Sequence, residues 1–239
     1  FLREAAGMIV PTDPRTGQNR VERANVQLVS KTYSAAERVY EEVKELILTC
    51  ELAGGELVSE GEIADRCQVS RTPVREAFLR LSAEGWMRLY PKRGALIVPI
   101  GEREAREVLD ARLLIEGHAV RDVVVREDGA AELVAALRAN LDEHNGARGE
   151  EFARIDTQFH QLIVEAGRNS LLTGFYTSLG ERRRRMTAAS VHRDPAVARR
   201  IRDDHAALAD AIAAGDADAF DRLLREHLAG VHELPGERR

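Results

Sequence analysis

Four residues in the C-terminal half of the chain have the types and spacing of a metal-binding group. Asp156 and His160 are four residues apart, so they share one face of a predicted helix. His205 lies ten residues before Gly215 and His227 lies twelve residues after it. Two antiparallel helices that turn at this glycine would place both imidazoles at nearly the same level. One carboxylate and three imidazoles could then converge inside a helical bundle, where such sites are usually built.

That donor set suits a divalent transition metal, namely zinc, nickel, iron, cobalt or manganese, rather than calcium or magnesium. A six-coordinate metal would keep open positions for water or for the carboxylate of an effector. We expect an effector-anchoring or ion-paired group nearby at Arg112 and Glu116. Taken singly, each histidine is more often structural or exposed. We therefore expect a structural or exposed role for the histidines that have no other candidate ligands near them in the pattern, which are His118, His144, His192 and His232.

The elements that position these residues are predicted to be helices. The chain has 239 residues, of which 44 % are hydrophobic, and this is enough for two ordinary domains or one large one. Only 5 % are aromatic, and Ala, Leu, Glu and Arg outweigh the β-branched types, so the fold class is expected to be mainly α. The two cysteines, Cys50 and Cys67, form no CxxC pair, which excludes a disulfide framework.

Apolar runs in the sequence stay short of the ~20 residues that a membrane helix needs. The first ten residues make a poor signal peptide because they include Arg3 and Glu4. We therefore expect a cytoplasmic protein with no membrane partner.

Three segments differ in character along the chain. Residues 1–33 are polar and rich in turn formers, so we expect a flexible or partly ordered segment. Residues 34–98 mix short helices with a hairpin. Residues 99–239 are nearly uninterrupted helix, and the arginine run at 182–185 within them is interpreted as a solvated or salt-bridged face. About six helices are predicted there: 102–126, 129–145, 150–167, 170–189, 195–213 and 217–233.

Three predicted helices and a hairpin follow one another within residues 34–98. S-x-x-E capping boxes at Ser34 and Ser59 start the first two helices. The third extends from about Arg71 to Glu84, with an apolar face at helical spacing. Two short strands come next: Met87 to Tyr90 and Ala95 to Val98. This order is the outline of a winged helix-turn-helix.

The charge distribution in this region favours a nucleic-acid partner. The whole chain has a net charge of −5. Residues 34–65 carry two basic and nine acidic side chains, whereas residues 66–93 carry seven basic and two acidic ones. Local positive charge attracts a phosphate backbone whatever the total charge. Charge alone would fit a solvated helix face equally well.

The second helix of a helix-turn-helix pair lies in the major groove, with its N-terminal residues on base edges and phosphates. Arg71 and Arg75 are four residues apart and project from one side of that helix. Their planar guanidinium groups suit guanine O6 and N7 or a phosphate. Lys92 and Arg93 occupy the hairpin tip, where a wing could follow a minor groove. The predicted DNA-binding residues are therefore Ser70, Arg71, Thr72, Arg75, Lys92 and Arg93.

The segment from Val69 to Leu81 (VSRTPVREAFLRL), with Glu84-Gly85-Trp86 and Arg93-Gly94 after it, closely resembles the winged-helix signature of GntR-family transcriptional regulators. The resemblance covers residues 34–98. It implies that Arg71, Thr72 and Arg75 read DNA and that Gly94 lets the wing backbone approach.

One position departs from the GntR pattern. The family often has an arginine early in the second helix that touches DNA, and this sequence has Gly61 there. We therefore expect an altered operator preference or a somewhat weaker set of contacts, without loss of DNA binding.

The all-helical C-terminal half resembles the FCD ligand-binding domain of the FadR subfamily, and six helices would fit its VanR-like branch. The D-x₃-H … H … H arrangement of Asp156, His160, His205 and His227 matches metal-binding members of that domain. Asn169 also follows the family's pattern, although a helix N-cap explains it equally well.

The resemblance and the residues together lead to one expected function. We expect a repressor that binds operator DNA as a homodimer and responds to a small organic acid bound at the metal. A metalloenzyme that uses the Asp/His₃ group is the alternative. Against an enzyme, the sequence has no G-x-S-x-G nucleophile motif and no phosphate-binding glycine loop.

Overall fold

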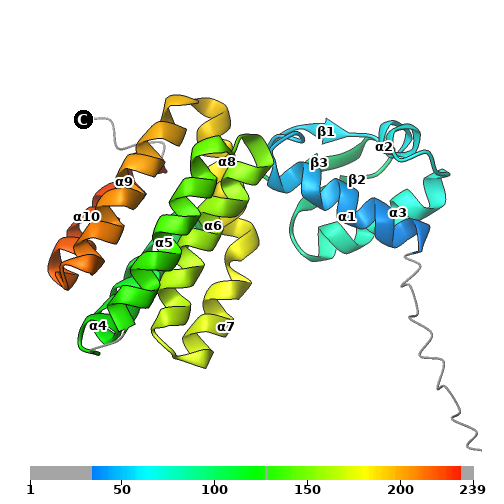
Figure 1. Ribbon diagram of the computed structural model, residues 1–239. Helices are drawn as coiled ribbons and strands as arrows, with labels where there is room; N and C mark the ends of the chain where they lie inside the picture. Colours follow the sequence, from blue (N-terminus) through cyan, green and yellow to red (C-terminus); the bar gives the residue numbers. More distant parts are fainter. Residues whose placement is uncertain (1–33, 127–128, 233–239) are drawn as a thin grey trace, which may run out of the picture. The chain divides into compact units, whose positions relative to one another are not determined.

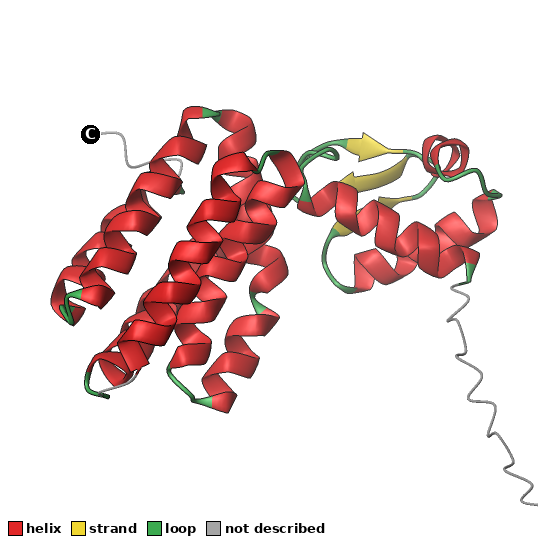
Figure 2. Ribbon diagram, viewed as in Figure 1, coloured by secondary structure: helices red, strands yellow, loops and turns green. Residues whose placement is uncertain are grey.

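The computed structural model describes residues 34–126 and 129–232 of the chain (Figure 1). Ten helices and one three-stranded sheet make up these residues, which confirms the mainly α fold class (Figure 2). Across these residues, each helix is too short or too polar to cross a membrane. The expectation for residues 1–33 lies outside the described part of the chain.

The first six elements form the winged helix-turn-helix that the sequence predicts. The sheet is antiparallel with the order β1-β3-β2, and Leu57 of β1 pairs with Leu96 of β3. Strand β1 was not predicted from the sequence, because two residues are too few to show any periodicity. The elements are α1 (Ala35–Leu48), β1 (Leu57–Val58), α2 (Glu60–Arg66), α3 (Arg71–Ala83), β2 (Met87–Tyr90) and β3 (Gly94–Ile97).

Local hydrogen bonds fix where these helices begin. Ser59 and Glu62 form a complete capping box, in which each side chain accepts a hydrogen bond from the other residue's backbone N–H. Ser34 accepts a hydrogen bond from the backbone N–H of Glu37 at the start of α1. The helices and the sheet enclose one hydrophobic core, whose fully buried members include Val43, Ile47, Val74, Leu81, Ala95 and Ile97.

The hairpin turn between β2 and β3 depends on Gly94. This residue has a φ of +103°, which L-residues with a side chain rarely adopt. A Cβ at this position would lie only 2.2 Å from the carbonyl oxygen of Val58 in β1. The glycine is therefore required by the close approach of the hairpin to β1, and its role toward DNA stays a prediction.

The remaining seven elements form an all-helical bundle. Helix α6 packs against α4, α5 and α8, while α9 packs against α5 and α10, and α10 returns to α4 (Figure 1). Their shared core includes Val120, Leu137, Phe159, Leu208 and Phe220. The helices are α4 (Glu102–Val124), α5 (Gly129–Gly146), α6 (Gly149–Ala166), α7 (Ser170–Ser178), α8 (Gly180–Arg193), α9 (Ala196–Ala213) and α10 (Ala217–Val231).

The bundle has one more helix than the sequence predicts. The single helix expected at 170–189 is divided into α7 and α8, because α7 ends at Ser178 and α8 begins at Gly180. The backbone N–H of Leu179 donates to the carbonyl of Tyr176 three residues earlier, which tightens the last turn of α7. The six-helix count that indicated the VanR-like branch is therefore wrong for this chain.

Helices α9 and α10 form the antiparallel pair expected around Gly215. The glycine has a φ of +69°, and the side chain of Asp216 accepts a hydrogen bond from the backbone N–H of Ala219 to start α10. The two helices pack along their lengths. This hairpin brings His205 and His227 to the same level of the bundle.

The role of Gly94 leads to a stability prediction. Gly94→Ala is expected to lower the free energy of unfolding of the winged helix by about 3 kcal/mol, because the new Cβ meets the Val58 carbonyl. Urea denaturation followed by the fluorescence of Trp86, the only tryptophan, measures this change. Gly85→Ala is the control, since Gly85 also has a positive φ but a methyl group added there would meet nothing within 4 Å. Equal losses in the two variants would contradict this role of Gly94.

Candidate functional site

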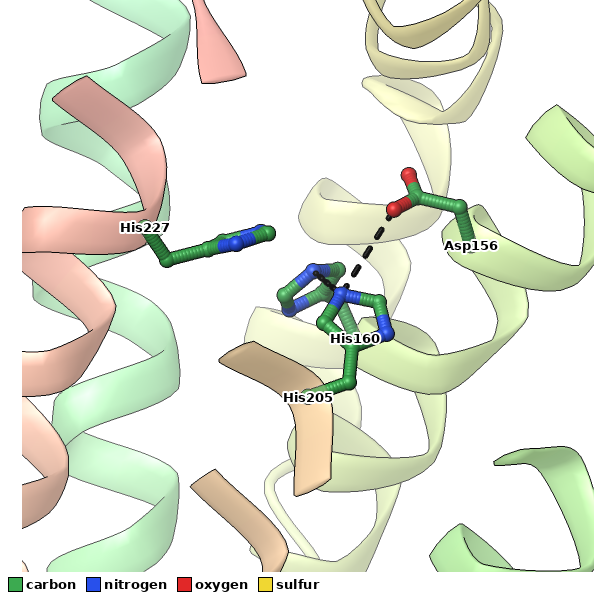
Figure 3. A group of neighbouring side chains, drawn as sticks. All are labelled: Asp156, His160, His205 and His227. Carbon is green, nitrogen blue, oxygen red and sulfur yellow. Dashed lines mark hydrogen bonds and ion pairs between the residues drawn. The ribbon is translucent and has the colours of Figure 1, made fainter. Parts of the chain in front are cut away.

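The structure brings together the four residues of the predicted metal-binding group. Helix α6 supplies Asp156 and His160, α9 supplies His205, and α10 supplies His227 (Figure 3). Each residue offers one donor atom, and these atoms all lie within 4.8 Å of one another. All four side chains are buried. The spacing of these residues in the sequence therefore agrees with their arrangement in space.

Two distances between donor atoms match those of neighbouring ligands of a single metal ion. His160 Nε2 lies 3.1 Å from His205 Nε2, and His205 Nε2 lies 3.5 Å from Asp156 Oδ1. Two ligands that are each about 2.0–2.2 Å from a metal, at an angle of roughly 90–110°, are themselves about 3.0–3.5 Å apart. The observed spacings are thus those of neighbouring ligands, so this buried Asp/His₃ group could hold a metal.

In two of the histidines, the ring nitrogen that faces away from the group lies within hydrogen-bond distance of a carboxylate. Nδ1 of His160 lies 2.7 Å from Glu116 Oε2, and Nδ1 of His227 lies 3.1 Å from Asp204 Oδ2. An imidazole that donates its Nδ1–H to a carboxylate keeps its Nε2 lone pair for a metal, and the carboxylate fixes the ring orientation. Asp204 was not predicted from the sequence, because a single sequence does not show which side of α9 faces His227 on α10.

Burial sets the protonation states of these groups. Burial lowers the pKa of His160 to about 4, and burial together with His160 lowers the pKa of His205 well below its usual value. Both imidazoles are therefore neutral near pH 7. Burial would raise the pKa of Asp156, but His160 and Arg112 outweigh it and lower that pKa. The ionised Asp156 also accepts a hydrogen bond of 2.8 Å from the Thr187 hydroxyl.

Glu116, which contacts His160, also forms the ion pair with Arg112 that the sequence predicts. Arg112 Nε donates to Glu116 Oε1 over 2.9 Å, and the Tyr176 hydroxyl donates to the same oxygen. Burial would raise the pKa of Glu116, but His160 and Arg112 outweigh it and hold that pKa well below its usual range. The pair expected from the sequence is thus a fully buried ion pair, and it lies directly beside the Asp/His₃ group.

A second buried arginine, Arg183, lies close to this pair. Its guanidinium carbon is 3.9 Å from the centre of the Tyr176 ring, and the side chain is only 2 % exposed. Within the described residues, Nε and Nη1 of Arg183 and Nη2 of Arg112 have no hydrogen-bond partner. Buried guanidinium N–H groups require an acceptor such as an anion or water. The interpretation of residues 182–185 as a solvated face is therefore wrong for Arg183.

The other predicted residues of this half lie apart from the group or at its edge. Asn169 is exposed, and its side chain accepts a hydrogen bond from the backbone N–H of Leu172, so it is the N-cap of α7. His144 is buried, with its ring centre 5.7 Å from that of His205. Its Nε2 lies 3.2 Å from the carbonyl oxygen of Phe152. His118 and His192 are exposed, and His232 is buried beside Ser190.

The predicted DNA-binding residues gather around a groove between α3 and the β2–β3 hairpin. The groove has a volume of about 640 Å³, and its lining includes Arg71, Arg75, Lys92, Arg93 and Gly94. Both α3 arginines are exposed, while Val74 and Phe78 of the same helix are buried. Ser70 and Thr72 line the neighbouring surface at the N-terminus of α3. An exposed concave surface with four cations is suited to the phosphate backbone of DNA.

Two protein-family models match this chain. The model of the gntR family of bacterial regulatory proteins matches residues 35–97. The FCD domain model matches residues 107–230, which is more than half of the chain. The two matches cover the winged helix and the helical bundle, respectively.

Curated relatives match over most of their length. An HTH-type transcriptional regulator from an unstable DNA locus of Streptomyces ambofaciens is 30 % identical, with 82 % of each chain aligned. The HTH-type transcriptional repressor RspR of Escherichia coli is 26 % identical over 86 % of this chain and 90 % of its own. A probable D-xylose utilization operon transcriptional repressor of Paenarthrobacter nicotinovorans is 30 % identical over 80 % of this chain and 86 % of its own.

Solved structures share the fold. Escherichia coli McbR/YncC aligns with a TM-score of 0.58 at 22 % identity, covering 83 % of this chain and 95 % of that one. A GntR-type transcriptional regulator of a Rhodococcus species aligns with a TM-score of 0.59 at 21 % identity, covering 87 % and 100 %. At these identities the likeness shows the architecture alone.

The buried histidines lead to a pH prediction. The pKa of His160 is about 4 in the folded chain and about 6.5 when unfolded. Between pH 6.5 and 4 the unfolded chain therefore binds more protons, and the free energy of unfolding of the metal-free protein should fall as the pH is lowered. Urea denaturation at several pH values in this window measures the slope.

The variant His160→Gln is expected to flatten this slope in part, because His205 also has a lowered pKa and continues to titrate. His192→Gln is the matched control, since His192 is exposed. Identical slopes in the two variants would show that His160 is not the source of the pH dependence.

Proposed function

The chain belongs to the GntR family of bacterial regulatory proteins and carries an FCD domain, and from this premise we propose that it is a repressor controlled by a small organic acid. The chain is a transcriptional regulator, since its family and its relatives are transcriptional regulators and not enzymes. Two of the relatives are named as repressors. The comparisons give no support to the metalloenzyme alternative.

One observation carries the proposal: a basic, exposed groove and a buried Asp/His₃ group occur in the same chain. The groove contributes Arg71 and Arg75 from α3 and Lys92 and Arg93 from the hairpin. Arginine at the start of a recognition helix can donate two hydrogen bonds to guanine O6 and N7, and lysine suits phosphates. The two features together are what a DNA-binding regulator with its own sensor requires.

The DNA-binding unit is proposed to be a homodimer on a pseudo-palindromic operator. One small winged helix makes few base contacts, so its sequence discrimination is limited. A two-fold axis doubles the contacts and requires two half-sites in the DNA.

A divalent transition metal is proposed to be held by Asp156, His160, His205 and His227. When bound, such an ion supplies a local positive charge with open positions that attract a carboxylate. The chain's own residues prepare the site, because Glu116 orients His160, Asp204 orients His227, and a hydroxyl holds Asp156. Nε2 of His160 and Nε2 of His205 face each other across 3.1 Å within the group.

The effector is proposed to be a small carboxylic acid that also engages Arg112 and Arg183. Both guanidinium groups are buried and have N–H groups without a partner among the described residues. A guanidinium fork matches the two oxygens of a carboxylate. Asn169 is not included in this proposed effector site, because its side chain is the N-cap of α7. An acid that binds one arrangement of the dimer better than another would change the affinity for the operator.

The DNA-binding proposal is tested by replacing both recognition-helix arginines. Arg71→Ala combined with Arg75→Ala is expected to abolish sequence-selective binding, with a loss of at least about 30-fold for a selected duplex, since each base contact contributes about 1–3 kcal/mol. Fluorescence anisotropy with that duplex measures the affinity. The control is Arg103→Ala with Arg106→Ala, which removes the same charge from exposed positions of α4. Retained selectivity in the first variant would refute this use of α3.

The metal proposal is tested with ligand and orienting residues separately. His160→Ala with His227→Ala is expected to remove stoichiometric metal. Asp204→Asn is expected to weaken binding by about 10–100-fold, because the His227 ring loses its carboxylate partner. Competition with a chromogenic chelator measures the affinity. Asp203→Asn is the matched control at an adjacent exposed position. A ligand variant that still binds one metal per chain would contradict the assignment.

A further inference from the structure

Both arginines of α3 that line the groove lie next to residues of α2. Arg75 Nε donates to Glu60 Oε2 over 2.7 Å. The guanidinium of Arg71 lies over Gly61, where an added Cβ would be 3.5 Å from Arg71 Nη2. All four residues line the same groove. A methyl group at position 61 would thus make ordinary van der Waals contact with the Arg71 guanidinium.

The capping box explains why Glu60 and Gly61 are placed there. Ser59 and Glu62 start α2, so Glu60 is the first residue of that helix and Gly61 the second. A carboxylate is stabilised in the first turn of a helix by the helix dipole. Glu60 is therefore held at a fixed place on the wall of the groove, within reach of Arg75 one turn into α3.

The ion pair is not explained by stability. The side chains of Arg75 and Glu60 are 63 % and 31 % exposed, and ion pairs between solvent-exposed side chains contribute little to stability. Glu60 also places a negative charge in a groove whose other charged residues are basic, namely Arg71, Arg75, Lys92 and Arg93. A carboxylate at this position opposes the approach of any phosphate backbone, whatever the base sequence.

The geometry of the pair suggests what such a carboxylate does. Glu60 accepts a hydrogen bond from Nε of Arg75, which leaves the two terminal nitrogens of the guanidinium for other acceptors. A guanidinium that is held through Nε can donate both terminal N–H groups to O6 and N7 of a guanine. To neutralise a phosphate elsewhere, Arg75 would have to leave Glu60, and the carboxylate would then face the DNA without its partner.

We propose that Glu60 is a specificity-determining residue that holds Arg75 for a base edge and disfavours binding to DNA without the operator sequence. The proposal rests on the DNA-binding function proposed above. Glu60 acts through Arg75 and through its charge, so it is a positioning residue and need not touch the DNA itself. Its removal should weaken sequence selectivity while strengthening the general attraction to DNA.

The test compares Glu60→Gln with the unaltered full chain. The unaltered chain first selects duplexes from a randomised pool, and the best-bound duplex and a shuffled duplex of the same composition then serve as probes. Affinities for both are measured by fluorescence anisotropy over a range of salt concentrations. Asp65→Asn is the matched control, because Asp65 is an exposed carboxylate on the same helix outside the groove.

Glu60→Gln is expected to bind the shuffled duplex about tenfold more tightly, with little gain for the selected duplex. The slope of log affinity against log salt on the shuffled duplex should steepen by about one, since Arg75 becomes free to neutralise one more phosphate. Asp65→Asn should leave the ratio of the two affinities unchanged. The thermal midpoint of Glu60→Gln should stay within about 4 °C of that of the unaltered chain, which separates the effect from misfolding.

Two results overturn the proposal in distinguishable ways. If the unaltered chain selects no duplex, the proposed DNA-binding function fails, and the role of Glu60 fails with it. If the chain does select a duplex but Glu60→Gln keeps the same affinity ratio and salt slope as Asp65→Asn, only the role of Glu60 is refuted.

Discussion

The helical bundle depends on the mutual compensation of ionisable groups that are buried together. A buried charge is strongly unfavourable unless it is paired and hydrogen-bonded. Glu116 meets this requirement by accepting from Arg112 on its own helix, from Tyr176 on α7 and from His160 on α6. One carboxylate thereby connects three helices. The same contacts fix the His160 ring, so the packing of the bundle and the geometry of the Asp/His₃ group have a common origin.

The two proposed sites use electrostatics in opposite ways. In the winged helix the cations are exposed, and their attraction for phosphates operates through water and is screened by salt. In the bundle, burial keeps His160 and His205 neutral, and this makes their nitrogen lone pairs available to a metal at neutral pH. The buried guanidinium groups of Arg112 and Arg183 add positive charge beside that group. An anionic ligand that reached these guanidinium groups would find N–H groups that have no partner among the described residues.

Much of this arrangement follows from local sequence signals, and the remainder does not. The capping box at Ser59 and the turn at Gly215 are encoded by neighbouring residues, so α2 of the winged helix and the α9–α10 pair that carries His205 and His227 could be predicted. Burial of Arg183 and the partner of His227 depend on which side of a helix meets another helix, and a single sequence does not show this. The break at Leu179 was missed because Leu179 is not a typical capping residue and only this one residue separates α7 from α8. A two-residue strand such as β1 leaves no periodic pattern.

The most direct test of the proposed metal-dependent sensor is native mass spectrometry of the purified full chain under gentle conditions. We expect a dimer that retains about one divalent transition metal per chain, with or without the added mass of a small acid. A chain that stays free of metal after incubation with zinc, nickel or manganese would contradict the proposal. In that case the Asp/His₃ group would be a structural cluster, and the sensor would have to lie elsewhere in the bundle.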